Sequence, residues 1–333
     1  MSNNKFLHYA KSGEAIVLYF IIALSLVIGL VNPAFFSPST VVSLSRTIMI
    51  TLTFAICETI VIISGGIDVS FPAVATISFY AVAKVAVATG INNPLVLFGI
   101  GALIGALFGV INAVLIATFN VPPLIATLGV SSVANGATLA FLGTNIIATM
   151  PASFDKLATS ELLTYTSANN MTYSISGIIL LPIAVCILAW LVLRYTSFGR
   201  SIYAIGGDAR AARVVGINVT GVRYAVYILT GAVIGIAGVS YMAFNQQADP
   251  NVLMGSEMLV IAAVVVGGTR ITGGYGSVFG TILGVVLIAL IQNNLIMVGV
   301  PTEWQTFVVG LVILIGSSLT SIRAKTIADG PKI

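Results

Sequence analysis

The ionisable residues that could do chemistry are few and lie in unusual surroundings. Glu58, Asp68 and Lys84 lie within or beside long apolar stretches, and the chain has one histidine, His8. A catalytic triad of serine, histidine and aspartate, or a pair of facing carboxylates, therefore has no plausible placement. No glycine directly precedes a lysine, so a phosphate-binding loop of the G-x-x-x-x-G-K-[ST] kind is also missing. We expect no catalytic residues and no ATPase activity on this chain.

Composition indicates an integral membrane protein. Of 333 residues, 58% are hydrophobic and 7% are charged, which is far more apolar surface than a soluble core can hide. The net charge of +4 does not point to nucleic acid, because the basic residues are scattered between apolar segments. Cys57 and Cys186 lie inside such segments without metal-ligand spacing, so we expect neither a disulfide nor a metal site.

We predict an all-α, polytopic fold with about ten membrane-spanning helices, since each needs about 20 mostly apolar residues. The spans are expected at 15–31, 47–65, 71–90, 95–118, 123–143, 177–195, 221–243, 257–267, 277–296 and 304–321. The eighth is too short to cross alone, so it continues through 267–276 or forms a broken helix whose irregular backbone is buried or lines a cavity.

The basic residues orient these spans within a single transmembrane domain, 1–333. Basic residues favour the cytoplasmic side of a membrane, and with the N-terminus inside, eleven of the fourteen lie there: Lys5, Lys11, Arg194, Arg200, Arg210, Arg213, Arg223, Arg270, Arg323, Lys325 and Lys332. Only Arg46, Lys84 and Lys156 fall on or toward the outer side. Both termini, 1–14 and 322–333, are then cytoplasmic. The loop 144–176 is external, where it either meets a soluble partner or caps the spans.

The cytoplasmic segment 196–220 contains the most informative polar stretch of the chain. Gly206-Gly207 is expected to break the preceding helix, and Asp208 to cap a short helix over 209–215. Gly216 supplies the left-handed stop. The alanines of this helix keep it slim enough to enter a cleft in a partner. The alternative is an interfacial helix that only anchors the loop to anionic lipid.

Three motifs carry a family resemblance. In chain order they are G-G-I-D-V-S at 65–70, S-F-G-R-S-I-Y-A-I-G-G-D-A-R-A-A-R-V-V-G-I at 197–217 and G-G-T-R-I-T-G-G-Y-G-S at 267–277. Together, and in this family's order, they resemble the permease subunits of sugar-type ABC importers, which include the ribose permease and relatives for other monosaccharides, autoinducers and nucleosides. The resemblance covers essentially the whole chain.

The resemblance implies a non-catalytic subunit of the bacterial inner membrane that forms a path for a small hydroxylated solute, most simply a monosaccharide such as ribose. It implies a second permease, identical or paralogous, two separate ATPase subunits that bind ATP and Mg²⁺, and a periplasmic or lipid-anchored solute-binding protein. The residues that it assigns to coupling with the ATPase are Arg200, Gly206, Gly207, Asp208, Ala211, Ala212, Arg213 and Gly216.

The motif at 65–70 is expected to form a hinge or gate on the cytoplasmic side, with Asp68 or Ser70 capping the next helix. Relatives usually continue this motif with Val-Gly, whereas this chain has Phe71-Pro72, which predicts a stiffer turn. The candidates for the gate or pathway are Glu58, Gly65, Gly66, Asp68, Ser70, Asn112, Asn135, Arg270, Gln292, Asn293 and Asn294.

Each of these polar side chains has a structural alternative. The buried amides could form helix-to-helix hydrogen bonds, and Glu58 could brace a neighbouring helix, bind solute or carry a proton. An ion-coupled secondary transporter that works through Glu58 or Asp68 is the alternative function.

Glycines recur every fourth residue at Gly101, Gly105 and Gly109, and again at Gly276, Gly280 and Gly284. Such spacing predicts close approach of neighbouring helices. The two stretches also suit an inverted repeat of spans two to five and seven to ten. A shared use of small residues at helix contacts is the alternative.

Overall fold

The computed structural model describes residues 13–166, 172–301, 303–305, 307–312 and 314. Eight of the helices in this part are long and apolar enough to cross a membrane. They are α2 (Gly13–Val31), α3 (Pro38–Ile63), α4 (Phe71–Thr89), α5 (Pro94–Ala113) with the π-helical turn η2 (Val114–Thr118), α6 (Pro123–Ala137) with η3 (Thr138–Leu142), α8 (Leu180–Tyr195) after the 3-10 turn η4 (Gly177–Ile179), α11 (Val219–Asn245), and α13 (Val278–Asn294) with the 3-10 turn η5 (Leu295–Val298). The predicted polytopic helical fold is confirmed.

The connecting elements are short. They are the 3-10 turn η1 (Pro33–Phe36), α7 (Ala152–Ala158), the antiparallel strands β1 (Glu161–Thr166) and β2 (Thr172–Ser176), α9 (Ser197–Gly207), α10 (Ala209–Val214) and α12 (Glu257–Val266). The β1–β2 hairpin is a feature that the sequence analysis did not anticipate.

Two expected spans need correction or comment. The second begins at Pro38, nine residues earlier than expected, so Arg46 lies inside α3 and not in the loop before it. The eighth is the ten-residue α12, followed by irregular backbone up to Ser277, which confirms the broken helix. The tenth expected span, 304–321, lies largely outside the described residues, as do both chain ends, so the count of ten stays a prediction.

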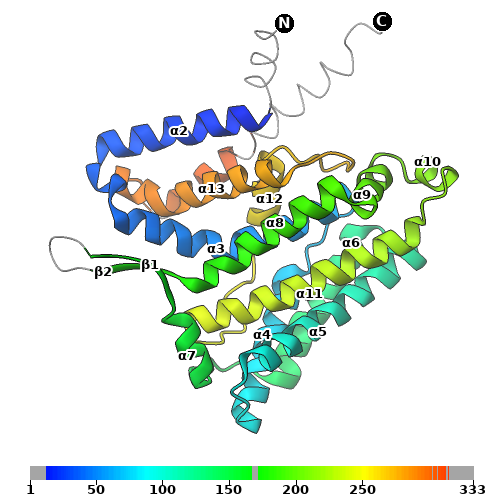
Figure 1. The fold of residues 1–333 in the computed structure, drawn as a ribbon, viewed down its shortest axis with the longest axis horizontal. Helices are drawn as coiled ribbons and strands as arrows, with labels where there is room; N and C mark the ends of the chain where they lie inside the picture. Colours follow the sequence, from blue (N-terminus) through cyan, green and yellow to red (C-terminus); the bar gives the residue numbers. More distant parts are fainter. Residues whose placement is uncertain (1–12, 167–171, 302, 306, 313, 315–333) are drawn as a thin grey trace, which may run out of the picture.

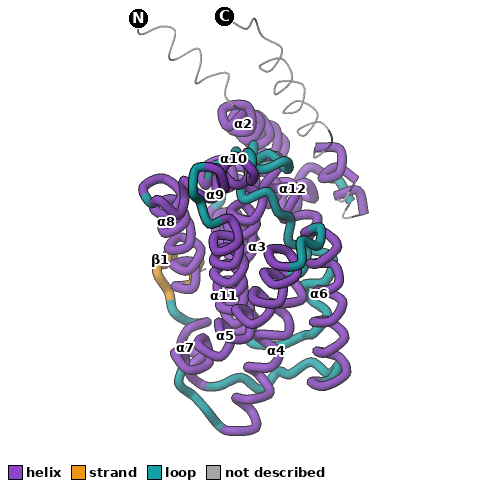
Figure 2. The backbone as a smooth tube through the Cα atoms, turned by 90° about the vertical axis from the view of Figure 1, so that its right-hand side faces the viewer, coloured by secondary structure: helices purple, strands orange, loops and turns teal. Residues whose placement is uncertain are grey.

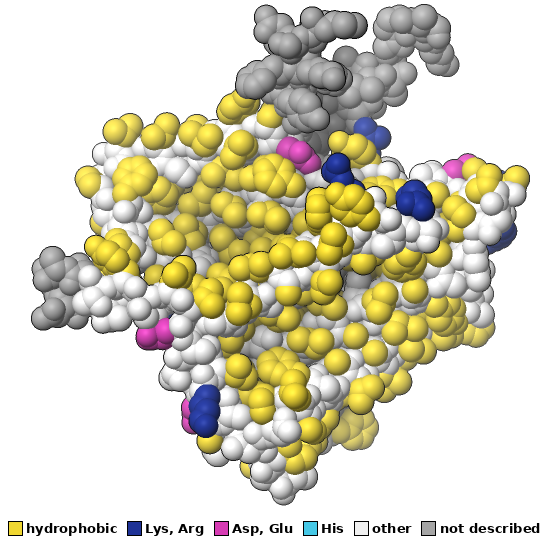
Figure 3. All heavy atoms as spheres, in the orientation of Figure 1, with side chains coloured by type: hydrophobic (Ala, Val, Ile, Leu, Met, Phe, Trp, Pro, Cys, Tyr) yellow, Lys and Arg dark blue, Asp and Glu magenta, His cyan; other side chains and the backbone are white. Residues whose placement is uncertain are grey.

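The helices α3, α4, α11 and α13 form the interior of the bundle, and α2, α5, α6 and α8 lie at its periphery (Figures 1 and 2). The peripheral helices expose many large apolar side chains, among them Leu30, Leu103 and Ile125. Figure 3 shows a face covered largely by apolar side chains, with the charged ones near its margins. Such a surface is compatible with lipid, because hydrocarbon requires no polar partner.

Glycines set the closest helix contacts, as their spacing predicts. A Cβ atom on Gly105 of α5 would collide with the carbonyl oxygen of Gly231 in α11. A Cβ atom on Gly280 of α13 would likewise collide with the carbonyl oxygen of Gly267, directly after α12. Close backbone approach is therefore confirmed at both glycine stretches.

The polar segments separate to opposite ends of the bundle (Figure 1). The helices α9 and α10 lie at one end, and α7 with the β1–β2 hairpin lies toward the other. α8 leads from the hairpin to α9. α11 begins after α10 and ends beside α7, where Gln246 Nε2 donates to the carbonyl oxygen of Phe154 at 3.0 Å. This separation is what the expected loops 144–176 and 196–220 require.

Candidate functional site

The three sequence motifs meet at one point of the fold. The backbone N–H of Gly274 donates to the carbonyl oxygen of Ile63 at 2.9 Å. Gly206 lies against both, because a Cβ atom there would overlap the Ile63 oxygen and lie 2.5 Å from the Gly274 nitrogen. A Cβ atom on Gly273 would lie 2.9 Å from the Cα of Gly65. We call these five residues the glycine junction.

Backbone conformation explains why glycine occupies these positions. Gly65, Gly273 and Gly274 have φ angles of 85°, 87° and 71°, a region that other residues enter only at a cost. Gly65 ends α3, and its N–H donates to the carbonyl of Ile62 at 2.9 Å. The junction thus joins the end of α3, the loop after α12 and the end of α9 without intervening side chains.

One tyrosine ties the loop of the third motif to α9, and a second tyrosine contacts an arginine within the loop. The hydroxyl of Tyr203 in α9 donates to the carbonyl oxygen of Gly276 at 2.9 Å. Burial raises the pKa of Tyr203, so the hydroxyl keeps the proton that it donates. The guanidinium of Arg270 lies 4.8 Å from the ring centroid of Tyr275. Arg270, a pathway candidate, is therefore exposed within this loop.

The short helix α10 forms as its sequence predicts. Asp208 Oδ1 accepts the N–H groups of Arg210 at 2.8 Å and Ala211 at 3.1 Å. These backbone hydrogen bonds, from Ala211 and then Arg210, lower the pKa of Asp208. Gly216 supplies the left-handed stop with φ 86°. Two details differ: α9 runs through the glycine pair and ends at Gly207, and α10 ends at Val214, one residue early.

The surface of α10 corrects one assignment and adds two residues. Ala212, expected to enter a partner's cleft, is buried against Ile205 and Val219 and holds α10 onto its own chain. The outward side chains include Val214 and Val215, which are 87% and 75% exposed. Sequence analysis missed this pair. Its signal is two adjacent valines at the end of an otherwise polar or small-residue helix, and exposed apolar residues of this kind mark contact surfaces.

Further exposed residues of this segment lie on α9 and α10. Arg200 lies on α9, and Arg210, Ala211 and Arg213 lie on α10, all exposed. Together with the two valines they form what we call the α10 face. An apolar centre beside guanidinium groups suits a protein partner that presents a pocket with carboxylates nearby.

Glu58 and Asp68 lie close together although a helix end separates them. Glu58 is 2% exposed and Asp68 is 4% exposed. The backbone N–H of Asp68 donates to Glu58 Oε1 at 3.1 Å. Asp68 Oδ1 accepts the N–H of Ser70 at 2.7 Å and its hydroxyl at 2.6 Å, and Asn112 Nδ2 donates to Ser70 Oγ at 2.9 Å. We call these four residues the buried polar cluster.

The hydrogen bonds of this cluster show what each of the two carboxyl groups holds in place. Glu58 braces the segment 64–70 between α3 and α4, which is the structural role that the sequence left open. Asp68 accepts the N–H of Ser70, the residue directly before α4, and so fixes the turn that leads into that helix. No side chain caps the first N–H groups of α4 itself, so the capping prediction for Asp68 or Ser70 is wrong. Gly66 leaves room for the hydroxyl of Tyr227, because a Cβ atom at position 66 would collide with it.

The other polar candidates lie apart from this cluster. Asn293 Nδ2 donates to Thr47 Oγ1 at 2.9 Å, an α13-to-α3 hydrogen bond. Thr47 precedes Glu58 by eleven residues in α3, about 16 Å at 1.5 Å per residue. Asn294 donates to the carbonyl of Leu290 at 3.3 Å, and Gln292 is half-buried beside them. These amides act between or within helices, and the structure does not gather them into one polar path.

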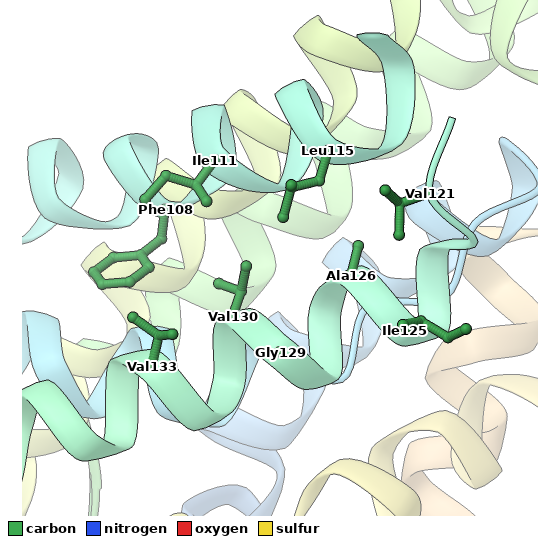
Figure 4. Close-up of a pocket in the computed structure, with 9 residues that line it drawn as sticks. All are labelled: Phe108, Ile111, Leu115, Val121, Ile125, Ala126, Gly129, Val130 and Val133. Carbon is green, nitrogen blue, oxygen red and sulfur yellow. The ribbon is translucent and has the colours of Figure 1, made fainter. Parts of the chain in front are cut away.

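One remaining candidate, Asn135, lies half-buried on α6, and its side-chain oxygen has no hydrogen-bond partner. An apolar groove of about 370 Å³ runs beside that helix, between it and α5 with η2 (Figure 4). Its lining residues are Phe108, Ile111, Leu115, Val121, Ile125, Ala126, Gly129, Val130 and Val133. This groove offers no polar side chain to a hydroxylated solute, so we do not place the solute there.

Comparison with known proteins gives consistent matches over most of the chain. Residues 40–316 match the family described as "Branched-chain amino acid transport system / permease component". A ribose import permease protein (RbsC) from Bacillus subtilis is 33% identical over 305 residues, which is 92% of this chain and 91% of the relative. No solved structure matches the chain.

Two further relatives carry other solutes in their names. A fructose import permease protein (FruG) from Bifidobacterium longum is 35% identical over 265 residues, 78% of this chain and 76% of the relative. An autoinducer 2 import system permease protein (LsrC) from Yersinia pseudotuberculosis is 31% identical over 320 residues, 93% and 84% of the two chains. With the family match over residues 40–316 and eight helices able to cross a membrane, the chain belongs to this family of multi-pass transport permeases.

Proposed function

We propose that this chain is the transmembrane subunit of an ATP-driven importer of the ABC type, and that its solute is a monosaccharide. The support is the similarity to import permeases named for ribose and fructose, which extends over 92% and 78% of the chain. The family description names branched-chain amino acids, and the relatives named for sugars favour a hydroxylated solute instead. Ribose and fructose are the first sugars to test.

The proposed partners follow from the two ends of the bundle. Separate ATPase subunits, which carry ATP and Mg²⁺, bind the α10 face on the cytoplasmic side. A solute-binding protein meets the opposite end, near α7 and the β1–β2 hairpin (Figure 1). A second permease, identical or paralogous, completes the solute path, because the polar candidates of a single chain are not gathered into one path. Both chain termini are then cytoplasmic.

The glycine junction supports the part of this proposal that concerns coupling to the ATPase. A rigid-body shift of α10 moves α9, because Ala212 of α10 packs against Ile205 of α9 across the break at Asp208. Gly206 at the end of α9 touches Ile63 and Gly274 directly. The shift is therefore passed to the segment 64–70 and to the loop before α13. ATP closure of the ATPase pair would bias this two-state element, and solute would bias it from the other side.

The test is association of the ATPase with a permease whose α10 face is altered. The variant Val214→Ser with Val215→Ser removes the exposed apolar pair and leaves the buried Ala212 contact unchanged. We expect the wild-type permease to retain the co-expressed ATPase during purification in lipid. The double variant should retain at least tenfold less ATPase, which corresponds to a loss of about 1.4 kcal/mol in binding free energy.

The matched control is Leu162→Ser with Leu163→Ser in β1, where the side chains are 45% and 64% exposed at the opposite end. This control should retain the ATPase. Equal retention by all three proteins would refute the assignment of the α10 face, and loss in the control would show that general instability is responsible.

An ion-coupled secondary transporter is the second candidate, and one observation favours it. Glu58 and Asp68 are both buried without an ion pair to a basic side chain among the described residues, as groups that bind protons or cations often are. That function predicts uptake in vesicles that contain no ATPase, driven by a proton or sodium gradient. ATP-dependent uptake that is indifferent to both gradients would exclude it.

A further inference from the structure

The buried polar cluster contains two carboxyl groups that no basic side chain of the described residues accompanies. Glu58 and Asp68 are 2% and 4% exposed, and no described lysine, arginine or histidine forms an ion pair with either. Buried carboxylates without a partner are expensive. Some positive species is therefore needed.

Two other side chains at the cluster have unmet hydrogen-bonding capacity. Asn112 and Tyr227 are each 2% exposed, yet Asn112 Oδ1 and the Tyr227 hydroxyl have no hydrogen-bond partner. Asn112 is joined to the cluster because its Nδ2 donates to Ser70 Oγ. The Tyr227 hydroxyl lies against Gly66, two residues before Asp68. Such unpartnered buried atoms call for an explanation.

The chemistry of these atoms selects the species. Asn112 Oδ1 is an acceptor only, so it needs a donor or a cation. One proton on a carboxyl group would satisfy at most one acceptor, whereas a cation is coordinated by several oxygens at once. Carboxylate, carbonyl and hydroxyl oxygens are hard ligands, which favours an alkali or alkaline-earth ion over a transition metal.

Local charge distinguishes between these two groups of ions. Asp68 accepts two hydrogen bonds from Ser70 and lies at the N-terminus of the 19-residue helix α4, whose dipole stabilises a negative charge. Glu58 accepts one N–H and has no such helix end. An ionised Glu58 would carry the one charge that these contacts leave unbalanced, and a monovalent cation balances it.

We propose that the buried polar cluster, together with Tyr227, binds one sodium ion through oxygens of Glu58, Asp68, Asn112 and Tyr227. The ion would join α3, the segment 64–70, α5 and α11, and so hold the break between α3 and α4 in the arrangement described. This proposal does not depend on the ATPase or on the identity of the solute, because every ligand belongs to this chain.

The test is thermal unfolding of the purified full-length permease in detergent, in chloride salts of sodium, potassium or N-methyl-D-glucamine at equal ionic strength with a divalent chelator. We expect sodium to raise the unfolding midpoint by several degrees and to saturate, as ligand linkage requires. Tyr227→Phe keeps the ring and should weaken the apparent sodium affinity severalfold. Glu58→Gln should abolish the sodium effect.

The control variant is Asp155→Asn, which neutralises an exposed carboxylate on α7 and should keep the full sodium response. If Glu58→Gln fails to fold, the wild-type titration and Tyr227→Phe still decide. An unchanged midpoint in sodium and N-methyl-D-glucamine would overturn the proposal. So would stabilisation by Ca²⁺ or Mg²⁺ alone, or a Glu58→Gln protein as stable as the sodium-bound wild type, which would mean that Glu58 carries a proton.

Discussion

The backbone N–H of Gly274 donates to the carbonyl oxygen of Ile63 at 2.9 Å. This hydrogen bond joins the loop before α13 to the last residue of α3, and the backbone of Gly206 lies directly against both groups. Since no side chain separates the three segments, a displacement of α9 cannot be absorbed by rotamer changes. The junction is therefore a stiff connection between α10 and the segment that contains Asp68.

Gly206→Ala should uncouple the permease. Its methyl group would overlap the Ile63 oxygen, and overpacking of this kind costs about 1–3 kcal/mol. We expect ATP-driven uptake to fall by about tenfold, equivalent to about 1.4 kcal/mol. The control is Gly207→Ala, because a Cβ atom at that position meets nothing within 4 Å. Equal uptake by the two variants would contradict the role of the junction.

Asp208→Ala should weaken ATPase binding, since it removes the acceptor for the first N–H groups of α10, whereas Asp208→Asn should retain it. The pKa of Asp208 is lowered from its ordinary 3.8 in the folded protein. Its carboxylate therefore stabilises α10 fully above pH 3.8, and this stabilisation is lost only as the pH falls through the lowered pKa of the folded state. Binding measured between about pH 5 and pH 7 should show no titration of this residue. A decline in that range that disappears in Asp208→Asn would be inconsistent with this capping role.

Asn293→Ala tests whether this amide lines the solute path or joins helices. Loss of the hydrogen bonds to Thr47 should lower the free energy of unfolding by about 0.6 kcal/mol, the mean for such bonds in membrane proteins. Thr47→Val should give a similar loss, and neither change should alter the KM for solute uptake. A raised KM with unchanged stability would instead place Asn293 in the path.

Gly105→Ala should destabilise the bundle by about 1–3 kcal/mol, because its methyl group would collide with the carbonyl of Gly231 in α11. Gly99→Ala in the same helix is the control, since a Cβ atom there meets nothing within 4 Å. Replacing this exposed glycine should leave stability unchanged or raised. Urea or thermal unfolding of both proteins measures the difference, which would vanish if α5 and α11 did not approach through glycine.

Much of the fold could be predicted from sequence because membrane spans depend on length and apolarity alone. The start of α3 was missed, although Ser37-Pro38 is a recognisable helix start, with proline at the first helical position. The β1–β2 hairpin has only weak signals, since its strands lie in a polar loop and most of their side chains are exposed or half-buried.

The site was predictable where local chemistry determines it. Asp208 and Gly216 flank α10, the helix that they cap or end, so their roles follow from adjacent residues. Ala212 was placed on the wrong face because its contacts, Ile205 and Val219, lie on neighbouring elements. The bond between Asp68 and Glu58 depends on how the chain turns after α3, and a single sequence contains no measure of that turn.

The most direct measurement is solute uptake by proteoliposomes that contain the permease, its ATPase and a solute-binding protein, with ribose and fructose as the first solutes. Wild type is compared with a variant in which Ala209–Val214 is replaced by a Gly/Ser linker. We predict uptake that requires ATP and is lost in the variant, while the variant still inserts in the membrane. Uptake that persists without the ATPase and follows a proton or sodium gradient would contradict the account.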